Sequence, residues 1–290
     1  MLPAHRGMSL MALSAFGASM MNASIKVVSS ELHSFEIAFF RNLFGFFTLL
    51  PTALRSGGIR ATLTTQRFPL HALRGVLNAL AMLCFFYSLT ITPLATVAAL
   101  GFTAPLFATL LAIPILKERV GPRRWAGLLT GFFGTLVVVR PGIETFSLGA
   151  ALLLFASLLW GGALVAIKLL ARTESSLTIT IYATLFLTPI TFAFAIFHWS
   201  WPGPQALLVL LLIATLGSIT QMAIAQAFHE ADASLVLPLD FTKLLWASLL
   251  GYFLFGEIPD LFAIIGGTII LLSVVYIAYR ERQRSRSPGE

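Results

Sequence analysis

Residues 97–127 read VAALGFTAPLFATLLAIPILKERVGPRRWAG, and they decide the fold because much of the stretch returns 139 residues later. Residues 236–266 read VLPLDFTKLLWASLLGYFLFGEIPDLFAIIG. The identical positions of this ungapped alignment include Val97, Leu100, Phe102, Thr103, Ala108, Leu110, Leu111, Glu118 and Gly127, which match Val236, Leu239, Phe241, Thr242, Ala247, Leu249, Leu250, Glu257 and Gly266. A shared apolar composition explains single matches, but Phe-Thr, Glu and Gly recurring in one register indicate a duplication. We therefore predict two related halves, residues 1–145 and 146–290, the second with a basic C-terminal tail.

The composition of the chain identifies its solvent as lipid. Of 290 residues, 58% are hydrophobic and only 11% are charged, and the mean hydropathy is +0.89. Soluble domains carry about 25% charged residues, and a membrane-spanning helix needs about 20 apolar residues. Ten apolar runs meet this need, near residues 8–28, 34–54, 70–90, 94–115, 125–140, 148–170, 177–198, 206–228, 234–255 and 261–279. The predicted fold class is an all-α polytopic membrane protein with ten transmembrane helices.

The distribution of Lys and Arg predicts the orientation, because cytoplasmic loops of membrane proteins are enriched in both. With a cytoplasmic N-terminus, the inner segments hold Arg6, Arg55, Arg60, Arg67, Arg74, Lys117, Arg119, Arg123, Arg124, Lys168, Arg172, Arg280, Arg282, Arg284 and Arg286. The outer segments receive only Lys26 and Arg140. We expect a multi-pass protein of the cell's inner (plasma) membrane, with both termini cytoplasmic. The net charge of +7 then orients the protein in lipid and does not indicate a nucleic-acid partner.

The loop charges also predict that the duplication is inverted. A shift of 139 residues covers five spans, and because five is odd, corresponding loops face opposite sides of the membrane. Residues 117–124 (KERVGPRR) are strongly basic, whereas their counterpart, residues 256–260 (GEIPD), contains no basic residue. Inverted repeats with a midplane site are typical of secondary transporters, which expose the site to each side in turn. We therefore expect transport by alternating access.

The segment FTAPLFATLLAIPILKERVGPRRWAGLLTGFFGTLVVVRPG, residues 102–142, resembles the end of an EamA-type repeat of the drug/metabolite transporter (DMT) superfamily. The matching features are Pro105, Glu118, Gly127, Gly131 and Gly134 in the first half, Glu257, Gly266 and Gly267 in the second, and Lys26 and Arg41 in the first two helices. The resemblance implies two five-helix repeats around a cavity lined by helices 1, 3, 4, 6, 8 and 9. It also implies a carrier of small metabolites, often an exporter, and favours amino acids, including apolar or aromatic ones. The second half departs from the pattern, with Leu244 where Pro105 has its match and Ala183 where Arg41 has its match.

Charged side chains within the spans are the first candidates for function, because ionisable groups are costly in a bilayer. Arg41 is either a gate or substrate-anion contact, or a structural partner of Glu36 or of helix-end carbonyls. Asp240 and Lys243 lie three residues apart on one helix face. They either bind solute or a coupling proton, or form a self-neutralising structural pair.

The other candidates fall into a gating group and a cavity group. Lys26 and Lys168 occupy equivalent helix ends, where each either extends to the interface or closes a gate onto neighbouring carbonyls. Glu118 and Glu257 occupy equivalent loops and suggest framework or gating contacts. The predicted substrate-binding residues are Asn22, Asn78, Thr103, Trp160, Gln221, Asp240, Thr242, Lys243 and Trp246. Any one of them alone is more often a helix–helix hydrogen bond or a lipid-facing aromatic side chain.

Other functions have little support in the sequence. No G-x-x-x-x-G-K-[ST], H-E-x-x-H or G-x-S-x-G motif occurs, so nucleotide-driven transport and familiar hydrolases lack their signatures. The single cysteine, Cys84, has no partner for an internal disulfide and belongs to no Cys/His metal spacing. We expect no enzyme activity, no cofactor and no metal; the partners are a small solute and membrane lipid, with a homodimer left open. A membrane-embedded enzyme and a channel-like pore remain the alternatives.

Overall fold

The computed structural model describes residues 3–55, 58, 62–101, 103–116, 122–139, 147–230, 242–258 and 260–286. These residues form helices and short connections, without a β-strand in the described ranges. The helices are α1 (Pro3–Val28), α2 (Ser34–Arg55), α4 (Phe68–Ile91), α5 (Leu94–Gly101), α6 (Thr103–Leu116), α7 (Pro122–Val139), α8 (Leu148–Leu170), α9 (Ser176–Ala195), the 3-10 turn η1 (Ile196–His198), α10 (Pro204–Glu230), α12 (Thr242–Phe255) and α13 (Leu261–Arg286).

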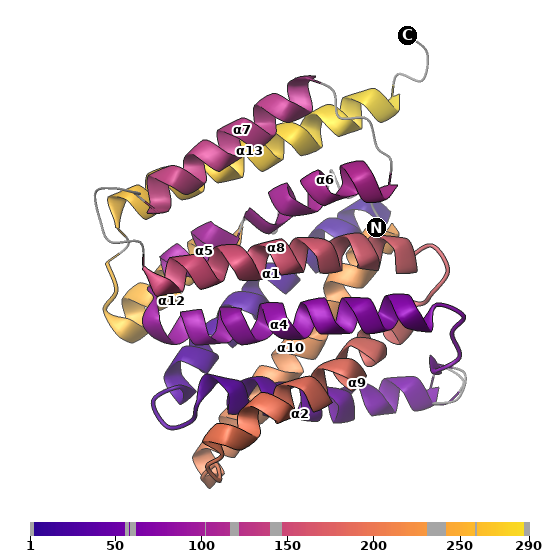
Figure 1. Ribbon diagram of the computed structural model, residues 1–290, viewed down its shortest axis with the longest axis vertical. Helices are drawn as coiled ribbons and strands as arrows, with labels where there is room; N and C mark the ends of the chain where they lie inside the picture. Colours follow the sequence, from indigo (N-terminus) through magenta and orange to yellow (C-terminus); the bar gives the residue numbers. More distant parts are fainter. Residues whose placement is uncertain are drawn as a thin grey trace.

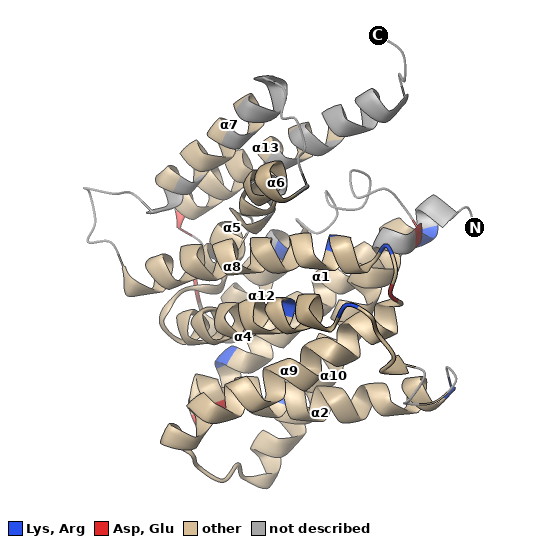
Figure 2. Cartoon of the chain, turned by 45° about the vertical axis from the view of Figure 1, so that its right-hand side comes forward, with Lys and Arg blue, Asp and Glu red and all other residues tan. Residues whose placement is uncertain are grey.

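The described helices suit a lipid environment in length, composition and surface. Seven helical segments are long and apolar enough to cross a membrane: Arg6–Val28, Ser34–Arg55, Phe68–Ile91, Thr96–Ile115, Leu148–Leu170, Ser176–His198 and Pro204–Ala227. Helices satisfy their own backbone hydrogen bonds, as the dry interior of a bilayer demands. Large apolar side chains stay exposed, for example Phe132 (60%) and Phe253 (76%), and the coloured charged segments of Figure 2 are few against the tan helices. The chain is a multi-span membrane protein.

The helices pack as a bundle in which α1 and α10 run obliquely to α4 and α8 (Figure 1). Helix α7 lies along α13 at one edge, α8 lies along α4 in the middle, and α2 lies along α9 and α10 at the opposite edge. Helix α1 packs along α10 and also contacts α12. Helix α12 contacts α5, and α6 contacts α8. The largest buried apolar cluster extends from α1 and α2 through α4 and α5 to α13.

Helices α7 and α13 approach closely through small residues. A Cβ added at Gly134 would lie 2.8 Å from the carbonyl oxygen of Gly266, and the Ser273 hydroxyl donates a hydrogen bond to the Gly127 carbonyl. A Cβ at Gly131 would meet Leu106 and Ser273 within 3 Å. Small residues let transmembrane backbones come together and gain van der Waals contact. The close contact of α7 with α13 is therefore made through Gly134, Gly131 and the hydrogen bond from Ser273 to Gly127.

Two of the expected runs are described only in part. Residues 94–115, expected to form one helix, comprise α5 and α6 with residue 102 outside the described residues, and Thr96–Ile115 is one candidate membrane span. In the run 234–255 the described helix begins at Thr242, and residues 231–241 lie outside the described residues. Arg74, expected in a cytoplasmic segment, lies inside α4, only 2% exposed, and donates from Nη1 to the Ile179 carbonyl at 2.5 Å.

Candidate functional site

An ion pair joins the two predicted halves at the end of the bundle where α1 finishes. The Lys26 ammonium lies 2.5 Å from Glu257 Oε1 and donates a second hydrogen bond to the Thr92 carbonyl at 3.0 Å. Glu257 Oε2 accepts from the Leu94 backbone N–H at 2.9 Å. Lys26 also lies 5.4 Å from the centroid of the Phe255 ring. We call this set, Lys26, Thr92, Leu94 and Glu257, the ionic lock.

Local sequence explains how Glu257 reaches the lock. Gly256 ends α12 with a φ of +65°, a conformation that glycine adopts without steric cost. The turn brings the Glu257 N–H to the Gly251 carbonyl at 3.1 Å, and the missing side chain of Gly251 leaves room for the carboxylate. On the other side, Leu94 is the first residue of α5, so its N–H has no partner within the helix and suits an anion.

A hollow lies directly beside the lock, between α5 and the end of α12. It encloses about 300 Å³ of empty space and is lined by Pro93, Thr96, Ala247, Ser248, Gly251, Glu257, Ile258 and Asp260. Thr96 belongs to the first half and Ser248 to the second, so both halves form its walls. Opening the lock would widen this hollow.

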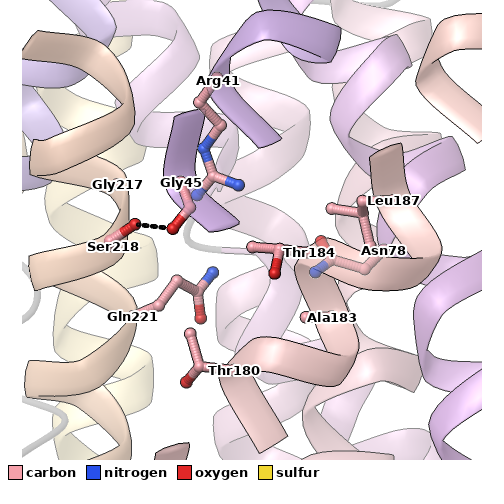
Figure 3. A pocket seen from close by; sticks show the side chains of 10 residues that line it. All are labelled: Arg41, Gly45, Asn78, Thr180, Ala183, Thr184, Leu187, Gly217, Ser218 and Gln221. Carbon is pink, nitrogen blue, oxygen red and sulfur yellow. Dashed lines mark hydrogen bonds between the residues drawn. The ribbon is translucent and has the colours of Figure 1, made fainter. Parts of the chain in front are cut away.

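A second cavity lies among α2, α4, α9 and α10 and is unusually polar for a membrane interior (Figure 3). It is a small space with room for about one water molecule, and its lining residues are Arg41, Gly45, Asn78, Thr180, Ala183, Thr184, Leu187, Gly217, Ser218 and Gln221. Hydroxyl and amide groups come from three of the four helices, and the only charge comes from Arg41 on α2. We call this the Arg41 cavity.

Arg41 is nearly completely buried, with 7% of its surface exposed. Its Nη1 donates to the neighbouring Asn42 Oδ1 at 2.8 Å, whereas its Nε is buried without a hydrogen-bond partner. The guanidinium lies against Gly217, where an added Cβ would stand 2.8 Å from Nε. The glycine therefore provides the space in which the guanidinium sits.

The predicted partner of Arg41, Glu36, is engaged elsewhere, so this structural alternative is wrong. Glu36 is fully buried, and its Oε1 accepts from the Ser200 N–H at 2.6 Å. Its Oε2 accepts from the His33 N–H at 3.2 Å. Glu36 thus caps the start of α2 and ties it to the α9–α10 connection, because a carboxylate at a helix N-terminus satisfies free backbone N–H groups.

The structure brings three predicted residues together and places the others apart. Arg41, Asn78 and Gln221 all line the Arg41 cavity. Thr103 donates to the Leu100 carbonyl at 2.6 Å, and Trp160 packs in an apolar cluster beside Ile167 and Leu170.

The remaining predicted residues lie on α1, α8 and α12 or outside the described residues. Trp246 packs edge-on against Phe16 at 5.0 Å, and the Lys243 carbonyl accepts from Ser19 at 3.4 Å. Thr242 begins α12, and the Oδ1 of Asn22 is buried without a partner. The side chain of Lys168 is exposed near the end of α8. Glu118 and Asp240 lie outside the described residues.

Three hydroxyl residues of the Arg41 cavity were not predicted: Thr180, Thr184 and Ser218. A periodic signal for them exists, because Thr180 and Thr184 lie four residues apart and Ser218 and Gln221 three apart, so each pair shares a helix face. Ser218 donates to the Gly45 carbonyl at 3.3 Å and lies 3.0 Å from Thr48 Oγ1. The described residues contain no group of His, Cys, Asp and Glu side chains suited to a metal ion.

The chain is similar to several proteins named as transporters. The chain is 30% identical over 278 residues to the S-adenosylmethionine uptake transporter of Rickettsia prowazekii, with 96% of this chain and 94% of that protein covered. It is 35% identical over 235 residues to the riboflavin transporter of Vibrio cholerae, covering 80% and 79%. It is 29% identical over 277 residues to the pseudopaline exporter of Pseudomonas aeruginosa, covering 94% and 95%.

The fold and the family are shared as well. One crystal structure matches with a TM-score of 0.68 at 18% identity, covering 96% of this chain and 99% of that chain, which shows a common fold. A sequence model described as the EamA-like transporter family matches residues 5–140 and again residues 147–279. The resemblance predicted from the sequence is confirmed: the chain belongs to the EamA-like transporter family.

Proposed function

We propose that this protein is a secondary transporter that moves a small metabolite across the inner membrane by alternating access. Its two inverted halves are residues 1–145 and 146–290, with both termini in the cytoplasm. The family match in two successive segments supports the halves. The relatives named for transport support the activity. When two inverted halves exchange conformations, a site between them that was open to one side of the membrane becomes open to the other side.

The packing of the helices supports a two-fold relation between the halves. Exchange of the halves pairs α1 with α8, α2 with α9, α4 with α10, α5–α6 with α12, and α7 with α13. It turns the α1–α10 contact into α8–α4, the α6–α8 contact into α12–α1, and the α2–α10 contact into α9–α4. All of these contacts are present. The α2–α9, α7–α13 and α5–α12 contacts each map onto themselves and are present too.

The ionic lock is the observation that carries the proposal. Lys26 and Leu94 come from the first half and Glu257 from the second, so the lock fastens one half to the other. In the proposed orientation it closes the outer side. Lys168 and Glu118 occupy the equivalent positions on the inner side. Alternating access then consists of breaking one of these fastenings while the other forms.

The relatives differ from one another in the named solute and in the direction of transport. The sequence favoured export of amino acids, but the three relatives are named for S-adenosylmethionine, riboflavin and pseudopaline, and for uptake as well as export. None of these names supports amino acids. We propose a small solute with a polar or charged head and an apolar remainder, and leave proton coupling and facilitated diffusion as alternatives for the driving force.

Counterflow in proteoliposomes tests the proposal. Purified protein is reconstituted with an unlabelled metabolite inside and the same metabolite, radiolabelled, outside; the panel includes S-adenosylmethionine, riboflavin and the amino acids. A carrier accumulates label transiently above equilibrium, because the internal solute drives the return step. A channel-like pore gives equilibration without this overshoot, and an enzyme gives a chemically altered solute. Either of these results would contradict the proposed function.

A further inference from the structure

We propose that the Arg41 cavity binds the carboxylate group of the transported solute, so that the substrate class is a small organic acid or amino acid-like anion. This inference rests on the proposed function and adds to it the position and chemistry of the binding site. It begins from a buried cation with an unused hydrogen-bond donor, Arg41 Nε.

The first argument concerns charge. Arg41 lies within the candidate span Ser34–Arg55 and is 7% exposed. A charged side chain inside a bilayer is costly unless it is paired or faces water. The salt bridges among the described residues join Arg6 to Glu230 and Lys26 to Glu257, and Glu36 is bonded to Ser200 and His33. Within the described part of the chain, Arg41 therefore has no carboxylate partner.

The second argument concerns the geometry of the cavity. In Figure 3 the Arg41 side chain enters from α2 and its guanidinium points between α9 and α10. The Gln221 amide extends toward the same space from α10, and Thr184 faces it from α9. A guanidinium recognises a carboxylate through two parallel N–H bonds, and the amide and hydroxyl groups provide further donors. Ala183 and Leu187 supply an apolar wall, against which the remainder of the solute lies once movement of the halves has widened the cavity.

The third argument concerns position between the halves. At the sequence offset that pairs Lys26 with Lys168, Arg41 pairs with Ala183 and Gly45 pairs with Leu187. All four of these cavity residues line the same space. A solute bound there contacts both halves and thus senses their relative movement. The cation is present in one half only, which gives the solute a single orientation.

Binding to the purified protein tests the site without knowledge of the natural solute. The probes are propionate and propionamide, which have nearly the same size but differ in charge, and the readout is the melting temperature in detergent. Propionate should raise the melting temperature of the wild type, and propionamide should not. Arg41→Gln should raise the half-saturating propionate concentration about tenfold or more, because it removes a charge-assisted contact worth at least 1.4 kcal/mol.

Two glycine variants separate the position of Arg41 from its charge. Gly217→Ala keeps the charge but places a Cβ 2.8 Å from Arg41 Nε, so it should weaken propionate binding as well. Gly203→Ala, where an added Cβ meets nothing within 4 Å, should leave binding unchanged. If Arg41→Gln does not fold, Gly217→Ala still decides: unchanged propionate binding in a folded Gly217→Ala protein overturns the proposal.

An inorganic anion such as chloride is the alternative ligand for the Arg41 guanidinium. If sodium chloride raises the melting temperature as propionate does and abolishes any further effect of propionate, the anion is a fixed counter-ion and the solute inference is overturned. Transport separates the two proposals. Normal counterflow of a panel metabolite by Arg41→Gln overturns the carboxylate site but leaves the carrier function intact. A wild type that binds propionate yet shows no counterflow overturns the carrier function instead.

Discussion

Neutralising Glu257 should open the side of the protein that the ionic lock closes. Glu257→Gln keeps the size of the side chain and an oxygen that can accept from the Leu94 N–H, but it removes the charge opposite Lys26. The amide N–H₂ group also brings a donor where the Lys26 ammonium already donates. The pair at 2.5 Å is then lost, and the closed arrangement loses the energy that this pair supplies.

The magnitude follows from the burial of the pair. The side chains of Lys26 and Glu257 are 17% and 18% exposed, so the pair lies between the exposed and buried cases. Exposed pairs contribute about 0–1 kcal/mol, whereas removing one partner of a buried pair costs about 3–5 kcal/mol. We take about 2 kcal/mol, which shifts the equilibrium between closed and open forms roughly 30-fold. A form populated at about 1% would then reach about 20%.

Cysteine labelling from outside measures this shift. Cys84, the only cysteine, is first replaced by serine, and Thr96→Cys places a thiol in the hollow beside the lock. A membrane-impermeant maleimide should label this thiol slowly in the parent and about 10- to 30-fold faster with Glu257→Gln. Glu31→Gln, which neutralises an exposed carboxylate in the α1–α2 connection, should not change the rate. Equal labelling rates in the parent and Glu257→Gln would refute the lock as a gate.

Two further predictions concern stability. Gly134→Ala should lower the melting temperature, because its Cβ would stand 2.8 Å from the Gly266 backbone and such overpacking costs about 1–3 kcal/mol; Gly203→Ala is the matched neutral change. The protein should also lose stability in acid. Burial lowers the pKa of His33, repulsion from His198 stacked at 4.0 Å lowers it further, and Glu36 opposes both effects. Because the unfolded chain binds this proton more readily, stability should fall as the pH drops below about 6.5, and His33→Gln should flatten the pH profile of the melting temperature. A profile equally steep in that variant would contradict the assignment.

The helical framework could be predicted because apolar length is a strong signal in lipid. The runs near residues 8–28, 34–54 and 148–170 correspond closely to α1, α2 and α8, since a bilayer leaves the backbone few alternatives to a helix. The carbonyl contact expected as one alternative for Lys26 is also present, at Thr92.

The partner of a mid-span residue is harder to predict, because helical periodicity gives the face of a side chain but not the helix opposite. Glu36 and Arg41 are close enough along α2 to suggest a pair, yet Glu36 binds Ser200 in a distant connection. Likewise, the resemblance predicted a cavity lined by helices 1, 3, 4, 6, 8 and 9. The hollow beside the lock lies between two of these, the fourth and ninth spans, whereas the Arg41 cavity lies among α2, α4, α9 and α10, of which only the third and eighth spans belong to the predicted set.

The proposed lock requires equivalent residues in both halves of the duplication, whereas the proposed anion site requires a residue that only one half carries. A carrier must visit both of its facing states, so the energies that close its two sides must be comparable, within about 3 kcal/mol if neither state is to fall below about 1%. The sequence preserves the lysine and the glutamate of the lock in both halves, as Lys26 with Lys168 and Glu118 with Glu257. A solute with one charged group needs only one cation, and a second arginine in place of Ala183 would put two like charges in one buried cavity. Residues that recur in both halves therefore suit the two gates, whereas Arg41, which has no counterpart in the second half, suits the binding site.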